Sequence, residues 1–96
     1  MILGKDRRDQ AGALAAYQES LDIRRKLAAQ DPGNAQAQID LVISLHEVST
    51  VADLSQARAA LAEALSILEK LEQKQKLTAS QKNWPNILRS ALSKLP

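Results

Sequence analysis

Two segments of this sequence are similar to each other. Residues 13–27 recur at 57–71, an offset of 44, with eight of fifteen residues identical. Ala and Leu could match by chance, but the repeated Glu19, Ile23 and Lys26 are harder to explain in that way. A period in the forties with one helix pair per period is typical of an α-solenoid. The repeat therefore predicts an all-α chain built from antiparallel helix pairs.

The composition favours the same fold class. Ala and Leu supply 31 of the 96 residues, and the chain has one Trp, one Tyr and no Phe. Ala and Leu are strong helix formers, whereas the residues that favour strands are scarce. Three Gly and three Pro leave few places for turns. We therefore expect about four long helices and no strand.

Turn and cap residues divide the chain. Residues 31–34 read Asp-Pro-Gly-Asn, a turn sequence in which Asn34 can cap the next helix. Asp53 with Gln56 resembles a capping box for the third helix. Pro85 predicts that the last helix starts late or kinks. The expected segments are an N-terminal remnant at 1–9, repeat helices at 10–30, 35–52 and 54–73, and a linker with a C-terminal capping helix at 74–96.

Apolar residues at helical spacing predict the core. They form one stripe on each of the first three helices: Leu14, Tyr17, Leu21, Leu41, Leu45, Val48, Leu61, Leu65 and Leu68. The middle helix is the most apolar, so we expect it to lie between the other two. The first helix has a neighbouring stripe around Ala16, Ile23 and Leu27, which is expected to face water.

Three segments carry a family resemblance: Ala13-Leu14-x-x-Tyr17-x-x-Ser20-Leu21-x-Ile23, Leu27-Ala28-x-x-Asp31-Pro32-x-Asn34 and Gln38-x-Asp40-Leu41-x-x-Ser44. Together they resemble the tetratricopeptide repeat (TPR) family, in the long-repeat subtype of large bacterial proteins. The resemblance covers about residues 4–72 and implies a truncated α-solenoid array. It departs from the family in the missing first helix A, in a short second turn without Gly, and in Leu61 where the first repeat has Tyr17.

The resemblance also implies a binding surface. In TPR arrays the A helices line a concave groove that holds a peptide or helix of a partner protein. Here the corresponding stripe is Gln36, Asp40, Ile43, Glu47 and Thr50. A helical wheel places the same residues opposite the buried stripe of their helix. Ile43 is then either a partner contact or an ordinary exposed side chain. The expected function is a non-enzymatic protein–protein interaction module.

No residue pattern indicates catalysis or a cofactor. The chain has no Cys and a single His, so a metal site is not expected. His46 and Glu47 are adjacent on a helix and do not face each other. Asp40 and Glu47 are two turns apart, about 10.5 Å along the axis, which is too far for a carboxylate dyad. Trp84 is interpreted as a plug for the end of the core rather than as an interface anchor.

The charge pattern predicts neither a nucleic-acid nor a membrane partner. Thirteen basic and eleven acidic residues give a net charge of +2. The basic runs at 5–8 and 24–26 have no interleaved aromatic residues, so we interpret them as solvated faces. The longest aliphatic run, at 41–43, is far short of a membrane span, and no signal peptide is evident. The expected location is the cytoplasm.

Self-association is the alternative function. The second stripe of the first helix, with Ala16, Ile23 and Leu27, predicts a homo-oligomer. Two arrangements are open: a twofold dimer of first helices, or an exchange of helices after the turn at 50–54 straightens. Asp53 and Gln56 favour a turn that stays closed, and hence the unswapped dimer.

Overall fold

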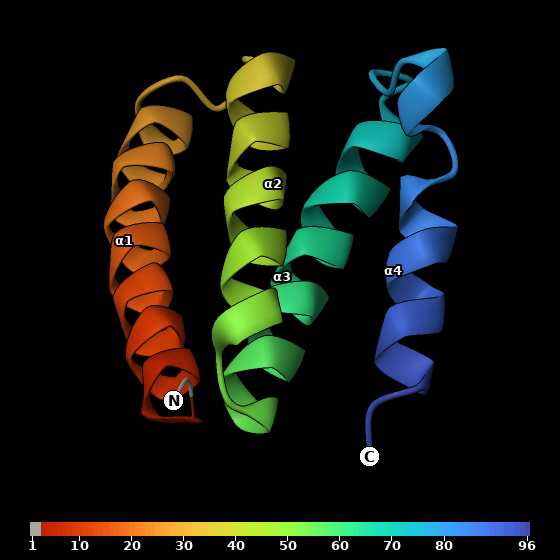
Figure 1. Cartoon of the computed structure of the whole chain (residues 1–96). Coiled ribbons are helices and arrows are strands. Elements are labelled where there is room, and N and C mark those ends of the chain that lie inside the picture. Colours follow the sequence, from red (N-terminus) through yellow and green to blue (C-terminus); the bar gives the residue numbers. More distant parts are fainter. Residues whose placement is uncertain (1–2) are drawn as a thin grey trace.

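In the part of the chain that the structure describes, four α-helices run alternately up and down in sequence order (Figure 1). The structure is a computed structural model that describes residues 3–96. Within these residues it contains no strand, so the all-α prediction is confirmed. A short 3₁₀ turn at Ala79–Gln81 precedes the last helix. The helices are α1 (Leu3–Gln30), α2 (Ala35–Val51), α3 (Leu54–Gln73) and α4 (Trp84–Ser93).

The helix bounds follow the breakers in the sequence. α3 has the predicted limits, and α2 ends one residue earlier than expected. α4 starts late, and Pro85 lies in its first turn, where a missing backbone N–H costs little. α1 is longer than expected, since it already begins at Leu3. Residues 4–9 contain no Pro, and each added helical residue gains a backbone hydrogen bond. Residues 1–2 of the expected N-terminal remnant lie outside the described residues.

Side-chain caps close the two tight turns. Asn34 Oδ1 accepts a hydrogen bond from the Ala37 N–H at 3.1 Å, which begins α2. Asp53 Oδ1 accepts one from the Gln56 N–H at 2.8 Å, which begins α3. Both residues satisfy N–H groups that the first helical turn leaves without partners. The turn between α2 and α3 is therefore closed within one chain.

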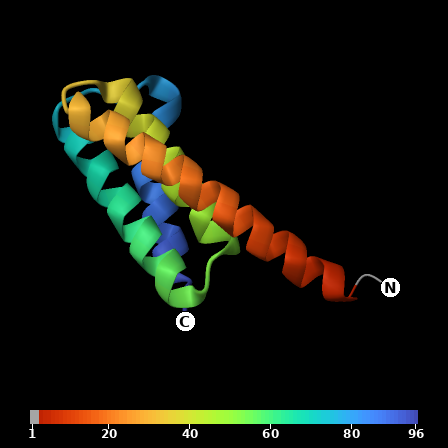
Figure 2. The same ribbon diagram turned by 90° about the vertical axis from the view of Figure 1, so that its left-hand side faces the viewer.

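Each helix packs mainly against its neighbours in sequence. α2 lies between α1 and α3, as predicted, and α4 packs on α3. The two views show α2 and α4 on one side of α3, while α1 crosses the bundle and its N-terminal turns extend past the other helices (Figures 1 and 2). The molecule is elongated, with principal extents of 50 × 30 × 22 Å.

The predicted core is confirmed. Six of the nine predicted side chains are buried, and the other three, Leu14, Tyr17 and Leu65, are partly buried and pack against them. Leu45 and Leu68 are among the most completely buried side chains, and they belong to α2 and α3. Because these two side chains face the core, the opposite sides of α2 and α3 face outward.

Among the residues whose side chains are described, three ion pairs connect helices on the surface, and two of them involve α3. The guanidinium of Arg25 on α1 donates two hydrogen bonds to the carboxylate of Glu63 on α3, with Nη2–Oε1 at 2.9 Å. Arg89 Nη2 on α4 lies 3.0 Å from Glu69 Oε2 on α3. All four side chains are substantially exposed, so each pair stabilises the fold by about 1 kcal/mol at most.

Candidate functional site

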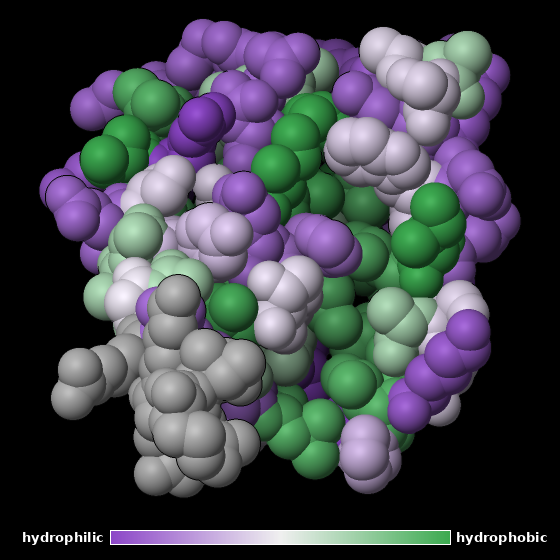
Figure 3. Space-filling view, in the orientation of Figure 1, coloured by the Kyte–Doolittle hydropathy of each residue, from purple (hydrophilic) through white to green (hydrophobic). Residues whose placement is uncertain are grey.

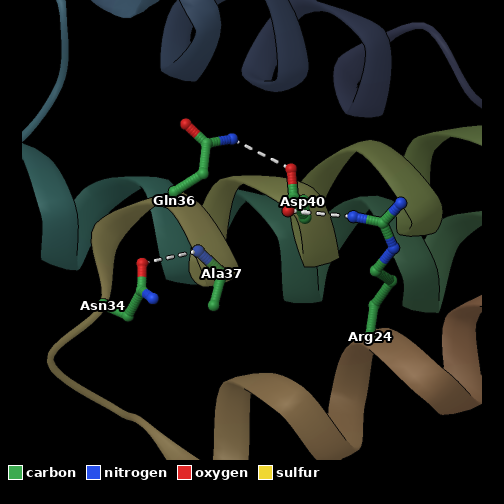
Figure 4. Close-up of polar contacts among 5 residues, drawn as sticks. All are labelled: Arg24, Asn34, Gln36, Ala37 and Asp40. Atoms are coloured by element: carbon green, nitrogen blue, oxygen red, sulfur yellow. Dashed lines mark hydrogen bonds and ion pairs between the residues drawn. The ribbon is translucent and has the colours of Figure 1, made fainter.

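The first part of the predicted α2 stripe is tied to α1. Asp40 Oδ2 lies 2.9 Å from Arg24 Nη1, and its other oxygen accepts a hydrogen bond from Gln36 Nε2 at 2.9 Å (Figure 4). Both carboxylate oxygens of Asp40 are therefore engaged within the chain. Arg24 lies one residue before Arg25, so neighbouring arginines connect α1 to α2 and to α3. Asp40 positions the two helices as well as contributing to the surface.

The remaining residues of the stripe differ in exposure. Ile43 is 43% exposed, and Thr50 is also exposed. Glu47 is half-buried. The Thr50 hydroxyl donates to the backbone oxygen of Glu47 at 2.6 Å, so it is satisfied within its own helix. Ile43 is the one apolar residue of the predicted stripe, and its side chain is accessible to a partner.

Ile43 borders an apolar groove between α2 and α4. The groove has a volume of about 190 Å³, and Leu68 of α3 contributes to its lining. Hydrophobic side chains gather between α2 and α4 on this face of the molecule (Figure 3). The lining side chains are Val42, Ile43 and His46 of α2, Leu68 of α3, and Trp84, Ile87 and Leu88 of α4. Six of these seven residues are apolar, so the groove suits an apolar ligand surface.

Of the seven residues that line this groove, only Ile43 was among the predicted binding residues. Ile87 is 53% exposed and stands across the groove from Ile43. Trp84 packs against the core as expected, but it also lines the groove. His46, interpreted as a structural or surface residue, is exposed and lies on the same side of α2 as Ile43. The spacing of the apolar residues 84, 87, 88 and 91 predicts which side of α4 is apolar. It does not predict which helix packs next to that side.

A second apolar surface lies on α1. Ile23 is 54% exposed and Leu27 is 50% exposed. Ala16 is exposed as well, while Ala13 and Ser20 on the same side of the helix are half-buried. This surface contains the three residues predicted for self-association, and it is separate from the residues that line the groove. We call Ala13, Ala16, Ser20, Ile23 and Leu27 the α1 seam.

Two other kinds of site are absent from the part of the chain that the structure describes. Among residues 9–96, whose side chains are described, no three His, Cys, Asp or Glu side chains are grouped so that they could hold a metal ion. No helix in this part of the chain combines the length and apolar character that a membrane span requires.

Comparisons of the chain with protein-family models, with curated proteins and with solved structures gave no match.

Proposed function

We propose that this chain is a non-enzymatic protein–protein interaction module, a TPR-like scaffold fragment that binds a peptide or helix of a partner protein. The apolar groove between α2 and α4 carries this proposal. The sequential packing of the helices supports it, because an α-solenoid has this packing. The family resemblance supports a setting in the bacterial cytoplasm, without a cofactor.

The lining of the groove specifies the kind of partner. Ile43 and Ile87 are half-exposed on its two sides, and Trp84 offers a large aromatic surface. Aromatic and aliphatic anchors of this kind dominate the energetics of protein interfaces. An amphipathic helix or an apolar peptide segment can place side chains between the two isoleucines. Asp40 of α2 already pairs with Arg24 of α1, so the partner needs no charged group to neutralise either side chain.

A displayed library of helical peptides tests this proposal. Peptides selected on the whole chain should perturb the fluorescence of Trp84, which is the only tryptophan. The double substitution Ile43→Asp and Ile87→Asp should weaken their binding about tenfold or more, because it removes two central anchors. Leu54→Asp is the matched control, since Leu54 is similarly exposed at 44% but does not line the groove.

Two results would contradict the groove proposal. One is that no selected peptide shifts the Trp84 emission. The other is that the Ile43 and Ile87 double variant binds the selected peptides as tightly as the Leu54 control does. Circular dichroism of the variants excludes unfolding as the cause of any loss of binding.

A second candidate function is self-association, favoured by a different observation. Ile23 and Leu27 lie on α1, away from the groove, and half of each side chain faces water. Together with Ala16 they form an apolar patch of the kind that marks an interface between proteins. This function does not compete with the groove, because the two surfaces share no residue.

A further inference from the structure

The α1 seam has the spacing of a helix–helix interface. Its residues stand at positions 13, 16, 20, 23 and 27, so the intervals alternate between three and four. This is the a/d spacing at which two helices pack side chains into each other. Two of its members, Ile23 and Leu27, are half-exposed, and no other described residue buries them.

The repeat supplies an internal reference for the seam. The equivalent positions on α3 are Ala57, Ala60, Ala64, Ile67 and Leu71. Four of these five are buried, and Ile67 is partly buried against the core. The same pattern is therefore a packed helix surface where neighbouring helices are present. Among the described residues, no helix covers Ile23 and Leu27 on the corresponding surface of α1 in this way.

We propose that the α1 seam packs against the α1 seam of a second copy, antiparallel, around a twofold axis level with residues 21 and 22. In this register Ala16 meets the partner's Leu27, and Ser20 meets the partner's Ile23. The symmetry repeats both contacts. Each small side chain thus faces a large one, which fills space evenly along the seam. The twofold pairing deepens the second candidate function, on which it rests.

The flanking charges select this orientation. Glu19 and Lys26 are exposed, and neither takes part in an ion pair among the described residues. Both are on the same flank of the seam, one position before Ser20 and Leu27 respectively. In the antiparallel register Glu19 lies opposite the partner's Lys26, and Lys26 lies opposite the partner's Glu19. Two equivalent attractive pairs then border the interface.

A parallel pair of α1 helices would lose these advantages. Identical residues would then face each other, so Ala16 would meet the partner's Ala16 and leave space, while Ile23 would meet the partner's Ile23. Glu19 would lie near the partner's Arg24, which is already bound to Asp40. The antiparallel arrangement uses the charges that are free among the described residues.

Two opposite charge reversals test the register. In a Glu19→Lys homodimer, the introduced ammonium group would face the partner's Lys26. In a Lys26→Glu homodimer, the introduced carboxylate would face the partner's Glu19. Each variant alone should therefore associate about tenfold more weakly than the unchanged chain, or worse. In an equimolar mixture, the heterodimer has two flanking charge pairs. One joins the two introduced groups, and the other joins the native Lys26 of one chain to the native Glu19 of the other. Both pairs are attractive, so association should recover. Sedimentation velocity on each variant and on the mixture measures this.

Lys70→Glu is the matched control, because Lys70 occupies the position of Lys26 in the second repeat. It should leave dimerisation unchanged, and circular dichroism should show that all variants are helical. If the unchanged chain dimerises but the mixture does not recover, the register is overturned while self-association stands. If the unchanged chain remains a monomer, both the register and the second candidate function fail. Neither outcome affects the groove proposal.

Discussion

α1 and α3 share one residue pattern but have different surroundings. On α3, Leu71 is buried, whereas its counterpart Leu27 on α1 is 50% exposed. Glu63 of α3 binds Arg25, whereas its counterpart Glu19 pairs with no described residue. The difference shows that the pattern determines which side of a helix can pack. The neighbours in the fold determine whether that side is covered.

The packing order explains this difference. α3 packs against two helices, α2 and α4. Among the described residues, α1 packs chiefly against α2. An apolar helix surface that no neighbouring helix covers stays in contact with water unless another protein covers it. Ile23 and Leu27 are apolar, which is why we place a second chain over the seam.

The largest expected effect comes from the repeated leucines. Leu71→Ala should lower the free energy of unfolding by about 2–5 kcal/mol, because it leaves a cavity in the core. Leu27→Ala should cost about 1 kcal/mol or less in dilute solution, because half of the side chain is already in contact with water. Urea denaturation at low protein concentration measures both. Equal costs for the two variants would show that the burial difference between α1 and α3 is wrong.

A smaller effect is expected at the repeated glutamates. Glu63→Gln should lower the free energy of unfolding by about 0.2–1 kcal/mol, since it weakens an exposed ion pair with Arg25. Glu19→Gln should leave the stability of dilute protein within about 0.5 kcal/mol. Raising the salt concentration should reduce the effect at Glu63 and leave that at Glu19 unchanged. If Glu19→Gln lowered the free energy of unfolding more than Glu63→Gln does, the account of the two glutamates would be contradicted.

The Arg25 side of this pair adds no pH dependence near neutrality. Its hydrogen bond to Glu63 raises the pKa of the Arg25 guanidinium above its ordinary value. When folding raises the pKa of a cation, the resulting stability is fully present below the pKa of the unfolded state. It is lost only as the pH rises through the pKa of the folded state. That loss lies in strongly alkaline solution. Arg25 therefore stays charged over the physiological range.

Much of the fold could be predicted from the sequence. The bounds of α3, the caps at Asn34 and Asp53, and the late start of α4 all depend on local residues, which act wherever the helix finally packs. The core residues followed from helical spacing in the same way. The length of α1 was underestimated because a charged segment without a breaker gives no signal for its start.

The candidate site was harder to predict because it depends on neighbours. The sequence indicated that Ile43 faces away from the core. That Ile43 shares a groove with Trp84 and Ile87 depends on where α4 packs, and no local pattern contains this information. Similarly, the pairing of Asp40 with Arg24 follows from how α1 crosses α2. Contacts between elements distant in sequence were therefore the part that needed the structure.

The mass of the unchanged chain in solution tests most directly whether the uncovered stripe of α1 needs a second copy. Light scattering after size exclusion, with the chain loaded at about 100 μM, detects association of moderate affinity by mass action. We expect a mass of twice the 10.5 kDa of one chain, decreasing towards one chain on dilution. A mass of 10.5 kDa at the highest concentration would contradict this expectation, and it would show that the α1 seam remains in contact with water.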